Sequence, residues 1–141
     1  MESIAFSISY YCYLVSSVIS ILFGLIYATR KQIMPYHLKA LQTEWDDIDP
    51  NYQLLLRALL NGGGYYGIAL GLSMMLLLFI PYSNHEMWAG YAIGGVGLVG
   101  ALPLGWIVYT VKTKTAGDPP LWLMVIVNLL LLVGLAAVTM N

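Results

Sequence analysis

Four long apolar segments constrain the fold of this chain more than any other feature. They cover approximately residues 4–28, 52–80, 87–111 and 121–140. A helix needs roughly 20 predominantly apolar residues to cross the hydrocarbon layer of a bilayer. Backbone groups inside that layer must find hydrogen-bond partners within the protein. The segments therefore predict an all-α fold, a bundle of four transmembrane helices that forms a single integral membrane domain over residues 1–141.

The composition supports a lipid environment. Apolar residues make up 60% of the chain and charged residues 9%, whereas a soluble domain carries about 25% charged residues. The net charge of -1 gives no basic surface for a nucleic-acid partner. The first apolar segment lacks the basic start and the cleavage site of a signal peptide, so we interpret it as a retained helix.

The basic residues are distributed unevenly along the chain. All of them lie on or beside loop 1 (residues 29–51) and loop 3 (residues 112–120), while loop 2 and the two termini have none. The positive-inside rule therefore predicts that loops 1 and 3 are cytoplasmic and that both termini are on the non-cytoplasmic side. The basic residues are Arg30, Lys31, Lys39, Arg57, Lys112 and Lys114.

Loop 1 is the main polar segment. Pro35 suits the first position of a helix, and apolar residues then recur with helical spacing, which predicts a short amphipathic helix within residues 34–46. Such a helix would lie in the headgroup plane of the membrane. The carboxylates that follow could bind a divalent cation, but Asp49 before Pro50 favours a helix N-cap instead. The sequence has no metal-ligand spacing, and we expect no metal site.

Small residues repeat at a spacing of four in the second and third apolar segments. This spacing places small residues on one side of a helix, where another helix can approach the backbone closely. We therefore expect the second and third helices to pack tightly, as a hairpin around loop 2. The predicted packing residues are Gly63, Gly67, Gly71, Gly90, Gly94, Gly97 and Gly105.

A few polar residues fall within the apolar segments. Arg57 and Asn61 are four residues apart and share one side of the second helix. Counting depth at 1.5 Å per residue puts Tyr65 and Asn128 in one layer of the bilayer, together with Tyr66, Ser20 and the Val99 carbonyl that Pro103 leaves free. These groups could satisfy one another or bind a ligand. The candidate ligand-binding residues are Arg57, Asn61, Tyr65 and Asn128.

Two resemblances follow from these residues. Arg57-Ala58-Leu59-Leu60-Asn61 resembles the Arg-Ala-x-x-Asn motif of the MAPEG superfamily of four-helix membrane enzymes, although Gln53 and Gly64 replace the acidic residues expected around it and no basic residue follows Lys114. That resemblance implies a trimer in which Arg57 and Asn61 hold glutathione between subunits. The MPYH sequence at residues 34–37, the acidic segment at residues 44–49 and the glycine run at residues 62–64 resemble small four-helix bacterial membrane proteins. This resemblance implies a bacterial inner membrane and no particular activity.

Two functional hypotheses remain. The sequence contains no nucleophile paired with a base, no P-loop and no carboxylate pair within the apolar segments, so we expect no catalytic residue and no cofactor. The first hypothesis is a non-enzymatic accessory subunit or homo-oligomer in the lipid bilayer, built on glycine-rich helix packing. The alternative is a MAPEG-like glutathione-dependent transferase.

Overall fold

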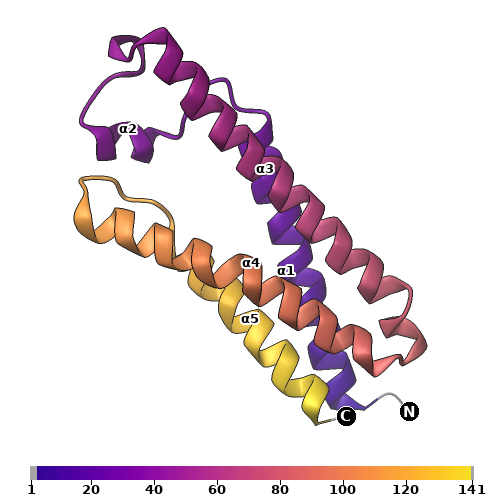
Figure 1. Cartoon of the computed structure of the whole chain (residues 1–141). Helices are drawn as coiled ribbons and strands as arrows, with labels where there is room; N and C mark the ends of the chain where they lie inside the picture. Colours follow the sequence, from indigo (N-terminus) through magenta and orange to yellow (C-terminus); the bar gives the residue numbers. More distant parts are fainter. Residues whose placement is uncertain (1–2, 141) are drawn as a thin grey trace.

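The computed structural model describes residues 3–140, and this part of the chain is helical without any strand. Four of its helices are long and apolar enough to cross a membrane, which confirms the predicted all-α class and is compatible with an integral membrane protein. Figure 1 shows the start of α1 and the end of α5 close together, at the same end of the bundle as the connection between α3 and α4. The elements are α1 (Ile4–Ala28), α2 (Pro35–Leu41), η1 (Trp45–Asp47), α3 (Pro50–Phe79), η2 (Tyr82–Asn84), α4 (Met87–Lys114) and α5 (Leu121–Thr139).

Local capping interactions fix the starts of α1 and α3. The Ser3 hydroxyl accepts a hydrogen bond from the backbone nitrogen of Phe6 at 3.0 Å. Asp49 caps α3, since its carboxylate accepts a hydrogen bond from the Asn51 nitrogen at 2.9 Å and Pro50 occupies the first turn. The predicted N-cap at Asp49 is confirmed. Side-chain acceptors at these positions satisfy amide groups that have no partner within the helix.

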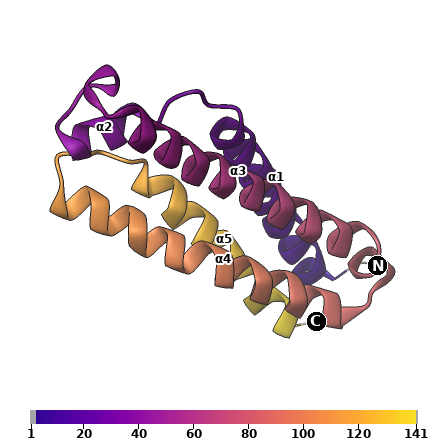
Figure 2. The same ribbon diagram turned by 45° about the horizontal axis from the view of Figure 1, so that its top comes forward.

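The closest helix contact joins α1 and α3. A Cβ atom on Gly64 would lie 2.7 Å from the carbonyl oxygen of Gly24 and would overlap the backbone nitrogen of Ala28. One turn further on, the Ser20 hydroxyl donates a hydrogen bond to the carbonyl oxygen of Gly67 at 2.8 Å. Figure 2 shows the two helices running side by side. The small residues of α1 therefore form the surface on which the glycines of α3 pack.

The expectation that the α3 glycines meet α4 is wrong. Gly67 and Gly71 face α1, where a Cβ on Gly71 would lie 2.7 Å from the Ser17 carbonyl oxygen. The helices α3 and α4 diverge from their connection at η2 toward the opposite end (Figure 1). Spacing alone did not identify the partner, because α1 carries its own small residues at Ser17 and Gly24.

The glycines of α4 instead make room for large side chains. A Cβ on Gly90 would lie 2.7 Å from the Tyr82 ring, one on Gly94 would lie 2.8 Å from the Tyr13 hydroxyl, and one on Gly97 would lie 2.6 Å from Leu131 of α5. Because the first two are side chains of η2 and α1, α4 is held on several sides. The interior consists of side chains from all four long helices, including Tyr13, Met74, Leu78, Tyr82, Ile93, Leu131 and Val138.

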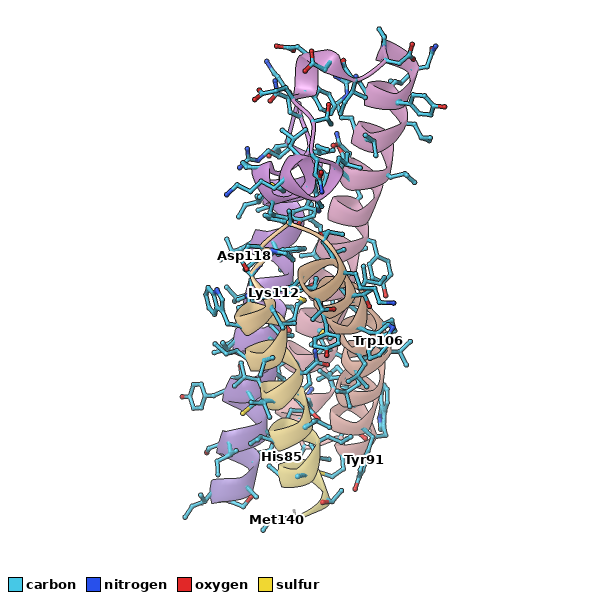
Figure 3. All side chains as sticks on the ribbon, turned by 90° about the vertical axis from the view of Figure 1, so that its left-hand side faces the viewer. His85, Tyr91, Trp106, Lys112, Asp118 and Met140 are labelled. Carbon is cyan, nitrogen blue, oxygen red and sulfur yellow. The ribbon has the colours of Figure 1, made fainter. Side chains whose placement is uncertain are left out.

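The four long helices differ in length. The helix α3 has 30 residues, whereas α5 has 19. Figure 3 shows that the beginning of α3 extends past the loop that carries Asp118, so that loop 1 lies beyond the ends of α4 and α5. The polar part of the chain is thus concentrated at this end, which we call the loop end.

Candidate functional site

Three polar residues form a strip along one side of α3. Arg57, Asn61 and Tyr65 follow one another at a spacing of four, so they lie on successive turns. Arg57 is exposed and Tyr65 is 64% exposed, and neither makes a hydrogen bond or ion pair with any residue between 3 and 140. The side-chain oxygen of Asn61 is buried without a partner in the described chain. We call these three residues the α3 strip.

Asn128 lies apart from the strip. Its amide nitrogen donates hydrogen bonds to the carbonyl oxygens of Met124 at 2.8 Å and Ala101 at 3.3 Å. It lines a groove of ≈ 430 Å³ between α4 and α5, with Gly105 and Trp106, and Trp106 points outward in Figure 3. The four candidate ligand-binding residues therefore fall into two groups on different helices.

The predicted polar layer is also divided. Ser20 bonds to the backbone of α3, Tyr66 is 57% exposed and Val99 is 75% exposed. The carbonyl that bonds to Asn128 belongs to Ala101 rather than Val99. A count of residues along a helix predicts depth, but it does not specify the direction in which each residue points around that helix.

Among the predicted packing residues, Gly63 has a different environment from the rest. It is exposed, and a Cβ atom there would meet nothing within 4 Å. The neighbouring Gly64 is buried and makes the contact with α1. Gly63 instead lines a cavity at the loop end.

This loop-end cavity was not identified from the sequence. It has a volume of ≈ 440 Å³ and lies among α2, α3 and the end of α4, with Tyr27 of α1 on one wall. Most of its lining is aliphatic. Only the apolar side of α2 was visible as a sequence signal, since the opposite walls come from segments distant in the chain. The lining residues are Tyr27, Ile33, His37, Ala40, Leu41, Leu56, Leu59, Leu60, Gly63, Val111 and Thr115.

Aromatic groups form one edge of the loop-end cavity. The phenols of Tyr27 and Tyr36 are hydrogen-bonded to each other, and the His37 ring lies 4.5 Å from the Tyr36 ring, measured between centroids. Burial lowers the pKa of His37. Burial also raises the pKa of Tyr36, against the opposing effects of its hydrogen bond with Tyr27 and the positive charge of Arg30. Arg30 follows the lining residue Tyr27 by three positions, and the lowered pKa of His37 favours its neutral form.

Loop 3 packs against α2 and completes the loop end. A Cβ on Gly117 would lie 2.6 Å from the Tyr36 carbonyl oxygen, so glycine allows the loop to approach closely. Lys112 forms an ion pair with Asp118 at 2.8 Å, visible in Figure 3. The hydrogen bond and the charge of Lys112 lower the pKa of Asp118. The positive charge of Lys112 is thus neutralised locally.

Hydrogen bonds hold the acidic part of loop 1 in place. Gln53 donates from its side-chain nitrogen to the carbonyl oxygens of Trp45 at 2.8 Å and Ile48 at 3.0 Å. These bonds attach the loop to the first turns of α3. No group of three His, Cys, Asp or Glu side chains in the described residues is placed to hold a metal ion.

Comparisons with known proteins give no relative for this chain. No protein-family model matches it, and no curated protein or solved structure matches it either. Its functional interpretation therefore depends on the geometry described above.

Proposed function

We propose that this chain is a non-enzymatic subunit of a larger membrane assembly, and that the α3 strip is its contact surface. The observation that supports the proposal is the set of polar side chains at Arg57, Asn61 and Tyr65 without partners in residues 3–140. Polar groups in or near hydrocarbon are costly unless they are paired. A second chain that packs on this side of α3 would supply partners for the exposed Arg57 and Tyr65 side chains and for the part of the Asn61 amide that reaches the surface.

The position of the strip favours association with another chain. α1 packs on the neighbouring side of α3, where Gly64, Gly67 and Gly71 lie, and the strip is left beside that interface. Asparagine side chains commonly hydrogen-bond across helices in membranes. Self-association is the simplest form of this proposal, because each copy would bring the same three polar groups.

Replacing Asn61 by leucine tests this proposal. The variant keeps the side-chain size and loses the amide, so association is expected to weaken about 3- to 30-fold, since an interhelical hydrogen bond in a membrane is worth about 0.6–2 kcal/mol. The measurement is energy transfer between labelled copies in bilayers, as a function of protein-to-lipid ratio. Ser73→Ala is the control, because Ser73 is exposed on another side of α3 and bonds only to the carbonyl oxygen of Ala69. Wild-type protein that remains monomeric, both in bilayers and when cross-linked in native membranes, would refute the proposal.

A second candidate function uses the same residues. Arg57 and Asn61 have the spacing of the MAPEG motif and are both unpaired in the described chain, so they could bind the carboxylates of glutathione between subunits. We expect glutathione at millimolar concentration to raise the Tm of the purified protein if this function is correct, and Arg57→Gln to abolish the rise. An unchanged Tm would exclude the transferase and leave the subunit proposal intact.

A further inference from the structure

The loop-end cavity has the shape and chemistry of a lipid site. We propose that it holds one acyl chain of an anionic phospholipid, whose phosphate lies against Arg30. This site is separate from the α3 strip and does not depend on the proposed assembly. The volume of ≈ 440 Å³ is within the range of about 300–1,000 Å³ that is usual for ligand sites.

The lining determines which part of the ligand enters. Leu56, Leu59 and Leu60 of α3 form one wall, and Ile33, Ala40 and Leu41 contribute from the segment that includes α2. The polar groups of the lining are confined to Tyr27, His37 and Thr115, and no carboxylate of the described residues contributes to it. Such a surface has no counter-charge for an ionic ligand within it, but it matches a hydrocarbon chain.

The charge around the cavity determines the class of headgroup. Arg30 is exposed and lies in the short segment between Tyr27 and Ile33, which both line the cavity. It makes no ion pair with any residue in the described range, whereas Lys112 is paired with Asp118. An arginine with free N–H groups beside an apolar cavity is well suited to bind a phosphate. Basic sites between helices are known to recognise anionic lipid headgroups.

The position of the cavity also suits a membrane lipid. The cavity is formed where the polar α2 meets the ends of α3 and α4, as Figure 2 shows for these three helices. A phospholipid that enters from the bilayer would keep its chain among the leucines while its headgroup remains at the level of Arg30. A soluble anion without a hydrocarbon chain would gain nothing from contact with the aliphatic walls.

Filling the cavity tests the acyl-chain part of the proposal, and the glycine run provides a matched pair of variants. Gly63 lines the cavity, Gly62 does not, and a Cβ atom at either position would meet nothing within 4 Å. Gly63→Leu and Gly62→Leu should therefore both fold and should gain similar helix propensity. Only Gly63→Leu places a side chain in the cavity.

The measurement is the Tm of the purified full-length protein in detergent, titrated with phosphatidylglycerol. We expect the lipid to raise the Tm of the wild type and of Gly62→Leu, and Gly63→Leu to lose about tenfold or more in apparent affinity. Equal responses of the two leucine variants would overturn the proposal. A similar rise with glycerol phosphate alone would also overturn it, because binding would then need no acyl chain.

Removing the charge tests the headgroup part. Arg30→Gln is expected to reduce the preference for phosphatidylglycerol over phosphatidylcholine about fivefold, the effect of one cation near an anionic lipid. Lys31→Gln removes the neighbouring exposed charge and is expected to keep the preference. If the two variants behave alike, or if the wild type binds both lipids equally, the assignment of the phosphate to Arg30 is wrong.

Discussion

Gly64→Leu is expected to separate α1 from α3 and to destabilise the bundle by at least about 3 kcal/mol, the upper end of the usual cost of overpacking. The new side chain would start against the backbone of Gly24 and Ala28, and backbone atoms cannot move aside as a flexible side chain can. Because α1 also packs on α5, its displacement would disturb the second helix pair as well. The measurement is unfolding in a detergent titration, followed by circular dichroism.

Gly62→Leu is the control for this prediction. It lies two residues away, and a Cβ there would meet nothing within 4 Å, so the substitution is expected to be neutral or to stabilise the helix by up to about 1 kcal/mol. Wild-type stability in Gly64→Leu would contradict the α1–α3 interface described above. Loss of stability in both variants would instead indicate that the glycine run is needed for its backbone freedom.

Tyr82→Ala is expected to cost about 3–5 kcal/mol, the range for removing a large buried aromatic side chain. The Tyr82 side chain is 0% exposed, its ring stacks on Phe6 with centroids 4.9 Å apart, and its hydroxyl is hydrogen-bonded to Ser9. Tyr82 therefore attaches the connection between α3 and α4 to the start of α1. Thermal unfolding in lipid nanodiscs would measure the loss.

Two further variants are compared with Tyr82→Ala, one that removes only the hydroxyl and one that removes an exposed tyrosine. Tyr82→Phe keeps the ring in its place beside Gly90 and removes only the hydroxyl, so a loss of about 1 kcal/mol is expected. Tyr91→Ala removes a tyrosine of α4 that is 47% exposed and is expected to have little effect on unfolding. If Tyr82→Ala lowers the stability no more than Tyr91→Ala does, then Tyr82 does not attach the connection between α3 and α4 to α1.

The four long helices could be predicted from the sequence because length and hydropathy are local properties. The helix pairing was not predictable, because several helices carry small residues that could face one another. The glycines of α3 show why the spacing did not identify the packing face. A strict spacing of four, as in Gly63, Gly67 and Gly71, drifts around a helix of 3.6 residues per turn, whereas Gly64, Gly67 and Gly71 stay closer to one line. The structure uses the second set against α1.

For the candidate site, relations within one helix could be predicted from the sequence, whereas relations between helices could not. Arg57 and Asn61 share one side of α3 because a spacing of four on one helix determines their relation. Asn128 could be placed at a depth but not in a direction, and it bonds to α4 instead. The loop-end cavity requires α2, α3 and α4 to be placed together, which no local pattern in the sequence specifies.

The unequal lengths of α3 and α5 have a consequence for bilayer thickness. At 1.5 Å per residue, α3 is about 45 Å long and α5 about 28 Å. A bilayer whose hydrocarbon layer matches α5 cannot contain α3 unless that helix tilts or projects into the headgroups. In a thicker membrane the first turns of α3, including Arg57, would be drawn toward the hydrocarbon at a cost of a fraction of a kcal/mol per ångström. The length of the lipid chains is therefore expected to alter the stability of the protein.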